Sequence, residues 1–142
     1  MIAGRSSVWT TLLITLFVVS TLGCASAGVP KPIGANDMPM LAGKWSGMLT
    51  LPTATAVPGT LTLSPDGTYS ASAGAFMAQG KATIKDGALN LMATSQTGGL
   101  SAIMGDSSSS ASLTERQGGT LVLTGYGKSD RGPFYFEVTK QK

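Results

Sequence analysis

The titratable residues of this chain lack the spacing that catalysis requires. The sequence contains no histidine, which is the commonest general base and metal ligand. A serine nucleophile would need Lys81 or Lys128 as its base, and no G-x-S-x-G turn presents such a serine. From Leu41 onward the carboxylates lie singly in predicted turns, loops and strands: Asp66, Asp86, Asp106, Glu115, Asp130 and Glu137. The sequence therefore predicts a protein that is not an enzyme and that holds no metal or cofactor.

The charged residues are few and dispersed. Ten Lys and Arg residues against seven Asp and Glu residues give a net charge of +3, and charged residues form 12% of the chain. The cations occur singly along the sequence, whereas nucleic-acid binding needs clustered cations with groove-reading or aromatic partners. This distribution excludes nucleic acid as a partner.

The elements that position the side chains are predicted to be β-strands. From Leu41 onward apolar and polar residues alternate, which is the period of half-buried strands. Turn sequences such as Ser64–Gly67 and Asp86–Gly87 separate the alternating segments. The expected strands cover residues 45–51, 60–63, 68–73, 76–85, 88–94, 98–104, 111–116, 120–126 and 134–139, with a Ser-rich loop at 106–110.

This pattern predicts an all-β domain over residues 41–142, built as an antiparallel up-and-down meander of eight or nine strands. Eight such strands can close into a barrel, and closure removes the exposed sheet edges. We therefore expect a small closed barrel. An open sandwich or a curved sheet is the alternative.

Small residues on the inward face of the central strands suggest an internal space. The small inward residues are Ala71, Ala73, Ala78, Gly80 and Ala82. A barrel of eight strands can hold one small ligand, although small side chains also permit tight packing. The candidate residues for a pocket that binds a small or apolar ligand are Tyr69, Phe76, Ala78, Gly80 and Met104.

The alternative function is a structural or protein-interaction role without a ligand cavity. Met48, Met77, Met92 and Ile103 fall on the predicted outer face. Methionine suits adaptable contacts, and a contiguous apolar patch would mark a partner site. A cavity without an outer patch would favour ligand binding, and an outer patch over a filled core would favour interaction.

The N-terminal residues predict export. Arg5 precedes the apolar run Val8–Leu22, and small residues follow at once. The run is shorter than the ~20 residues that span a bilayer core, so residues 1–23 are predicted to be a cleaved signal peptide. Residues 24–40 contain several prolines and glycines and are predicted to form a lipid-anchor site followed by an extended, flexible tether.

The sequence Thr21-Leu22-Gly23-Cys24 resembles the lipobox of bacterial lipoproteins. The resemblance implies that Cys24 is acylated and becomes the first residue of a protein anchored in the outer membrane and facing the periplasm. Ala25-Ser26-Ala27 offers a second cleavage site, before Gly28, which would release a soluble periplasmic or secreted protein. An uncleaved N-terminal helix is the third alternative.

The sequence Gly43-Lys44-Trp45 resembles the Gly-x-Trp signature that opens the first strand of lipocalin-like and avidin-like barrels. The resemblance implies that Trp45 plugs one end of the barrel beneath a cationic side chain from late in the chain. Arg131 and Lys140 are the candidates for that cation–π contact. The alternative for Trp45 is an ordinary core tryptophan.

Overall fold

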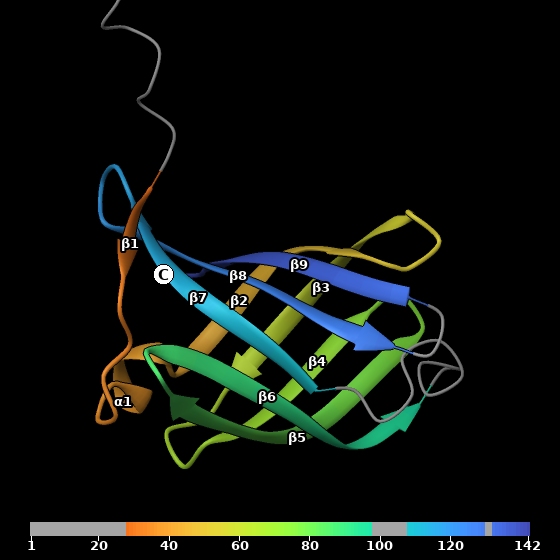
Figure 1. Cartoon of the computed structure of the whole chain (residues 1–142), viewed down its shortest axis with the longest axis horizontal. Helices are drawn as coiled ribbons and strands as arrows, with labels where there is room; N and C mark the ends of the chain where they lie inside the picture. The colour runs from red at the N-terminus through yellow and green to blue at the C-terminus, as the bar shows by residue number, and fades with distance from the viewer. Residues whose placement is uncertain (1–27, 98–107, 130–131) are drawn as a thin grey trace, which may run out of the picture.

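A single antiparallel sheet forms almost all of the structure, a computed structural model that describes residues 28–97, 108–129 and 132–142 (Figure 1). Within these residues one short helix accompanies nine strands. The elements are β1 (Val29–Lys31), α1 (Met38–Leu41), β2 (Gly43–Thr50), β3 (Ala56–Leu63), β4 (Thr68–Ala73), β5 (Phe76–Lys85), β6 (Ala88–Thr97), β7 (Ser108–Arg116), β8 (Thr120–Ser129) and β9 (Gly132–Lys140). No helix among the described residues is long and apolar enough to cross a membrane.

The strands β2 to β9 close into a barrel. Each strand pairs with the next one along the chain, and β9 returns to pair with β2 from Trp45↔Lys140 to Thr50↔Tyr135. The pairing of β7 with β8 completes the circle. The prediction of an all-β meander that closes on itself is therefore confirmed.

Strand β1 lies outside this meander and shares one edge of β7 with β6. Strand β6 pairs with β7 over Ser108–Ala111, and β1 pairs with it over Leu113–Glu115. Ile33 then enters the core with 3% of its surface exposed, and its N–H donates to the Gly87 carbonyl at 3.1 Å. The described part of the predicted tether, residues 28–40, thus packs along the barrel instead of standing clear of it.

The turns follow the local sequence. Asp86 and Gly87 both have positive φ, 54° and 76°. A two-residue hairpin turn requires this conformation in order to match the twist of the strands that it joins. At the β3–β4 hairpin Asp66 accepts hydrogen bonds from the Thr68 N–H at 2.9 Å and from the Thr68 hydroxyl at 2.7 Å. The backbone hydrogen bond from Thr68 is the main cause that lowers the pKa of Asp66. Both predicted turns are present.

Several strand boundaries differ from the prediction: β3 begins at Ala56 instead of residue 60, and β8 ends at Ser129 instead of residue 126. Strand β6 continues to Thr97, beyond the predicted end at residue 94. Ser108–Ser110, predicted as part of a loop, belongs to β7, because these residues pair with both β6 and β8. The strand predicted over residues 98–104 lies outside the described residues.

The end of the barrel near α1 is filled by large side chains. Trp45, Leu41, Leu63, Leu89, Leu113 and Leu123 have under 2% of their surface exposed. Ile33 and the helix α1 cover this end, where Met38 and Met40 pack against the core.

The described strands and core residues all lie between Val29 and Lys140. A chain of residues 25–142 therefore contains every described strand together with the core that the strands enclose.

Candidate ligand cavity

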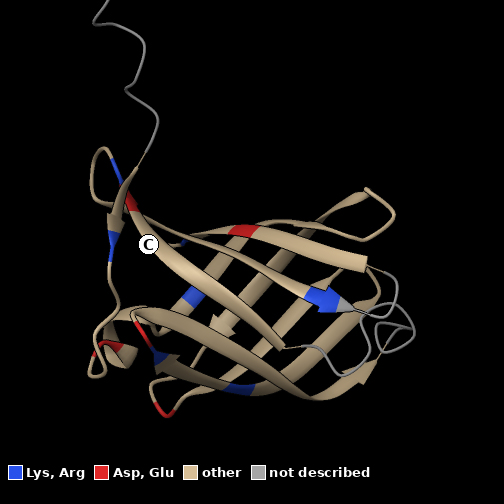
Figure 2. Cartoon of the chain, in the orientation of Figure 1, with Lys and Arg blue, Asp and Glu red and all other residues tan. Residues whose placement is uncertain are grey.

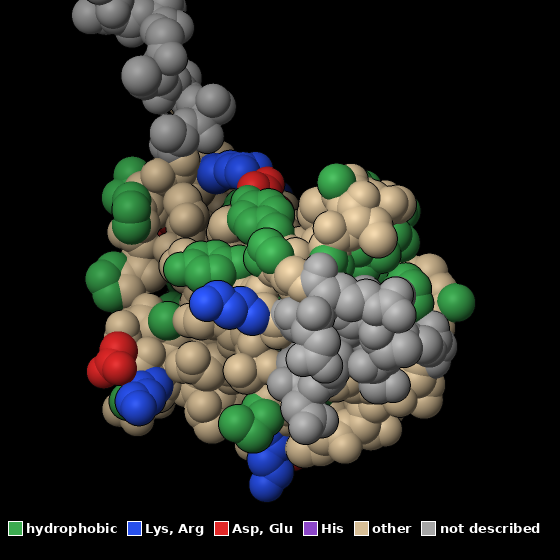
Figure 3. Space-filling view, turned by 45° about the vertical axis from the view of Figure 1, so that its right-hand side comes forward, with side chains coloured by type: hydrophobic (Ala, Val, Ile, Leu, Met, Phe, Trp, Pro, Cys, Tyr) green, Lys and Arg blue, Asp and Glu red, His purple; other side chains and the backbone are tan. Residues whose placement is uncertain are grey.

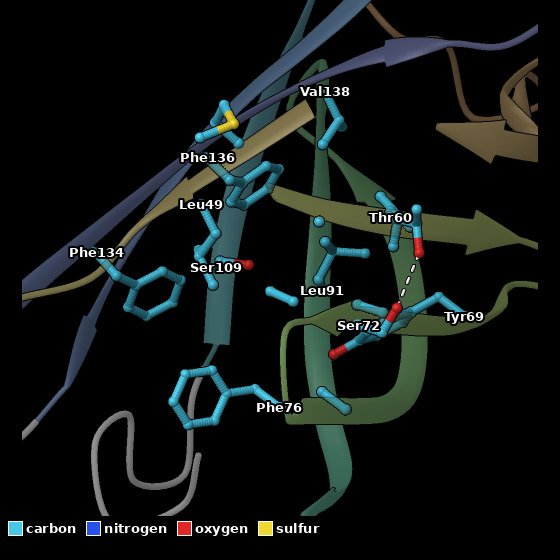
Figure 4. Close-up of a pocket in the computed structure, with 16 residues that line it drawn as sticks. Leu49, Thr60, Tyr69, Ser72, Phe76, Leu91, Ser109, Phe134, Phe136 and Val138 are labelled. Atoms are coloured by element: carbon cyan, nitrogen blue, oxygen red, sulfur yellow. Dashed lines mark hydrogen bonds between the residues drawn. The ribbon is translucent and has the colours of Figure 1, made fainter. Parts of the chain in front are cut away.

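A cavity of about 110 Å³ occupies the half of the barrel away from α1. Figure 4 shows the side chains that line it. Its walls come from strands on all sides of the barrel, and most of the lining side chains are apolar. The largest of them are Leu49, Leu61, Tyr69, Phe76, Leu91, Phe134 and Phe136. Because none of the fully buried side chains near α1 lines it, the cavity and the filled end are separate regions.

Small side chains leave this space open. Ala71 and Ala73 on β4, Ala78 on β5 and Gly59 on β3 all line the cavity. A larger residue at any of these positions would extend toward the volume that is now empty. The inward row of small residues therefore produces a space, which was one of the two outcomes that the sequence left open.

Two glycines on β8 allow two aromatic rings to lie against the barrel wall. Gly125 faces Phe136 across the β8–β9 ladder, and Gly127 faces Phe134. A Cβ on Gly125 would lie 2.3 Å from the Phe136 ring, and one on Gly127 would lie 2.4 Å from the Phe134 ring. Each ring therefore occupies the place of a missing side chain, which keeps it out of the centre of the barrel.

Two hydroxyl groups face this apolar space. Tyr69 from β4 and Ser109 from β7 both line the cavity, and their side chains point into it in Figure 4. Among the described residues neither hydroxyl has a hydrogen-bond partner, whereas the hydroxyls of Thr60 and Ser72 pair with each other at 2.9 Å. Burial raises the pKa of Tyr69 to about 12, so its phenol is neutral and remains a hydrogen-bond donor at neutral pH.

The residues predicted for the pocket do not all meet in it. Tyr69, Phe76 and Ala78 line the cavity. Gly80 is not one of the lining residues: it lies at a bulge in β5, where a Cβ would be 1.9 Å from the Met92 carbonyl oxygen. Its missing side chain allows this close approach of two strands. Met104 lies outside the described residues.

Most of the lining residues were not among the predicted pocket residues, and Phe134, Phe136 and Ser109 are instructive examples. The alternation on the last strand predicts that both phenylalanines face inward, but it gives no sign that they border a space. The sequence contains one signal that could have identified these two rings as lining residues. This signal is the Gly-x-Gly at 125–127, which can pair with the Phe-x-Phe at 134–136. The Ser-rich composition around Ser109 predicts a loop. The strand alternation that turns the Ser109 side chain inward was therefore not recognised.

Trp45 lies at the filled end of the barrel and is fully buried. Its indole N–H donates to the Leu41 carbonyl at 2.9 Å, which ties β2 to the end of α1. The Lys140 ammonium lies over the ring, 5.9 Å from its centroid, and donates to the Met40 carbonyl. Lys140 thus takes the position expected of a late cation, and Arg131 lies outside the described residues.

The exposed apolar residues are divided between two sides of the barrel. Met77 and Met92 lie on β5 and β6, with 51% and 63% of their surfaces exposed. Met48 lies on β2, and β3 and β4 separate it from them in the sheet. On the face that Figure 3 displays, hydrophobic side chains form separate groups. Ile103 and the acylation candidate Cys24 lie outside the described residues.

The charged groups are also dispersed. Figure 2 shows them spread over strands and turns, with most toward the end that bears α1. Lys31 pairs with Glu115 at 3.2 Å, and Arg116 pairs with Glu137 at 2.9 Å, both at the surface. Within the part of the chain that the structure describes, no three His, Cys, Asp or Glu side chains gather as a metal site would need.

Comparisons with protein-family models, curated proteins and solved structures found no significant match to this chain.

Proposed function

We propose that this protein binds a small, mainly apolar ligand inside its barrel. The observation that carries the proposal is the cavity of about 110 Å³, whose described lining contains aromatic, aliphatic and hydroxyl side chains. A ligand site is typically a largely apolar space with a few polar groups. An engineered apolar cavity of ~150 Å³ binds benzene or xenon, so this cavity has a size suited to a compact molecule.

The proposal includes export and lipid anchoring at Cys24, in the outer membrane and facing the periplasm, with a lipocalin-like or avidin-like barrel as the ligand-binding domain. The lipobox-like sequence at Thr21–Cys24 supports it. Because β1 begins at Val29 and is paired with β7, only the residues between Cys24 and Val29 remain to separate the barrel from the membrane. At full extension they span about 17 Å.

The proposal also assigns no catalytic activity to the barrel. The cavity offers the Tyr69 and Ser109 hydroxyls, and no described lining residue is a carboxylate or an amine. A hydroxyl nucleophile requires a neighbouring base, which these side chains do not supply.

Xenon tests the cavity directly, because it binds apolar spaces without needing a polar contact. We expect residues 25–142 under xenon pressure to show NMR shifts at Leu49, Leu91 and Phe134. Ala78→Leu fills the space and should remove these shifts. The matched control is Ala35→Leu, which makes the same change at an exposed position and should leave them intact. If xenon produces no such shifts in the unsubstituted protein, the cavity is refuted.

The anchor has a separate test. Expression of the full chain in a bacterium should give a membrane-bound protein that carries acyl groups at its N-terminus. Cys24→Ala should abolish the acylation and leave the protein unprocessed or outside the membrane fraction. Release of an unlipidated protein that begins at Gly28 would show instead that the alternative cleavage site is used.

A second candidate function, protein interaction, is favoured by one surface feature. Tyr126 and Tyr135 form a direct cross-strand pair on the outer face of β8 and β9, with 68% and 42% of their surfaces exposed. Met48 is diagonal to Tyr135, because Met48 pairs with Glu137. In vivo photo-crosslinking from position 126 should capture a specific envelope protein if this is a partner site, with position 81, an exposed lysine on β5, as the control.

A further inference from the structure

We propose that the ligand of the cavity is uncharged and carries an oxygen that accepts a hydrogen bond from the Tyr69 hydroxyl. This inference rests on the proposed ligand-binding function and specifies the chemical class of the ligand. It depends on three features of the cavity: the absence of charge from its described lining, the unpartnered hydroxyls within it, and its size.

The described lining offers no partner for an ionic ligand. It contains no Asp, Glu, Lys or Arg side chain. The ammonium group of Lys140 is already placed over Trp45 and bonded to the Met40 carbonyl at the other end of the barrel. Because burying an unpaired charge is strongly unfavourable, a carboxylate or an ammonium group would remain outside the cavity.

The Tyr69 hydroxyl supplies the polar contact. Tyr69 is 8% exposed, and its hydroxyl has no hydrogen-bond partner among the described residues. The hydroxyl borders the cavity, so it is available to donate a hydrogen bond to an acceptor group that enters this space. The rigid ring holds the hydroxyl away from the backbone of its own strand.

Ser109 is the less specific of the two hydroxyls. A serine hydroxyl rotates freely and can bond to backbone groups of its own strand. We therefore assign the directing contact to Tyr69 and only an accessory contact to Ser109. The rings of Phe76, Phe134 and Phe136 surround the apolar part of the ligand. Such a ligand would be a compact ketone, ester, ether or alcohol.

The test compares three probes of one ring size: cyclopentanone, methylcyclopentane and cyclopentanecarboxylate. Each is titrated at neutral pH into residues 25–142, and binding is followed by NMR. Cyclopentanone should bind in the cavity, and cyclopentanecarboxylate should not bind there. Tyr69→Phe removes only the hydroxyl, so it should weaken cyclopentanone about three- to tenfold, the equivalent of one hydrogen bond, and leave methylcyclopentane unchanged.

Two control variants complete the design. Ser109→Ala should change cyclopentanone binding by less than about twofold, and Tyr126→Phe, at an exposed tyrosine, should not change it. Equal binding of cyclopentanone to the Tyr69→Phe variant, a dominant effect of Ser109→Ala, or tight binding of the carboxylate would overturn this inference while the cavity itself survives. Failure of xenon and of every probe to bind would refute the proposed function instead.

Discussion

The two halves of the barrel interior use the same strands in opposite ways. Near α1, Trp45, Leu63 and Leu89 fill the cross-section and have under 2% of their surface exposed. In the other half, the small side chains of Ala71 and Ala78 leave a cavity of about 110 Å³, and Gly125 and Gly127 leave room for the rings beside it. Protein interiors are normally close-packed, and the fully buried side chains of the filled half are consistent with this rule. The open half departs from it.

This difference shows how one small domain can combine a filled core with an internal cavity. The filled half is tied together by Trp45, α1 and Lys140, so it does not depend on a ligand for its packing. The open half places its large rings over glycines, which holds the space open without a loss of wall contacts. Single substitutions can therefore perturb each half separately.

Removal of Trp45 should have the largest effect on stability. Trp45→Ala leaves a large cavity in the filled half and deletes the hydrogen bond to the Leu41 carbonyl. We expect the free energy of unfolding to fall by about 3–5 kcal/mol, measured by urea denaturation. Phe76→Ala, in the open half, should cost less than about half of that because Phe76 already borders empty space. Equal losses would abolish the contrast between the halves.

High pH should destabilise the protein through Tyr69. Its pKa is raised from 10.0 to about 12 in the folded state, so folding favours the neutral phenol. The stabilisation is fully present below pH 10 and is lost as the pH rises toward 12. The loss should reach about 2–3 kcal/mol. Denaturation across this range should show a shallower fall for Tyr69→Phe; parallel curves would contradict the assignment.

A methyl group on Gly125 should disturb the open half. Its Cβ would collide with the Phe136 ring, at 2.3 Å, and push the ring toward the cavity. We expect Gly125→Ala to cost about 1–3 kcal/mol and to reduce xenon binding. In a double-mutant cycle with Phe136→Ala, the combined loss should be smaller than the sum of the single losses by more than about 0.5 kcal/mol. Additive losses would show that the two positions are independent.

The cation over Trp45 should make the smallest contribution. Lys140→Met removes the ammonium from the ring and from the Met40 carbonyl while it keeps most of the apolar chain. We expect a loss of about 0.5–2 kcal/mol in unfolding free energy. The control, Lys128→Met, alters an exposed lysine and should stay within about 0.5 kcal/mol. A similar loss in both variants would remove any special role for Lys140.

Local sequence was sufficient to predict the strands and several inward residues, because a side-chain period of two is a local property. It could not place Gly80 or the Gly125–Phe136 contact, since both depend on cross-strand register. The segment 28–40 shows a different limit of prediction from local sequence. Its prolines favour extended backbone, which suits a free tether and an edge strand equally, and only the pairing with β7 distinguishes them.

Native mass spectrometry of residues 25–142 would decide whether the barrel carries a ligand. The protein would be expressed with an export signal, purified from a bacterial envelope without detergent, and measured before and after denaturation. We expect one small added mass per chain that disappears on denaturation and is absent from Ala78→Leu, in which the cavity is filled. A bare polypeptide mass that stays unchanged after incubation with an extract of the small molecules of the envelope would contradict ligand binding.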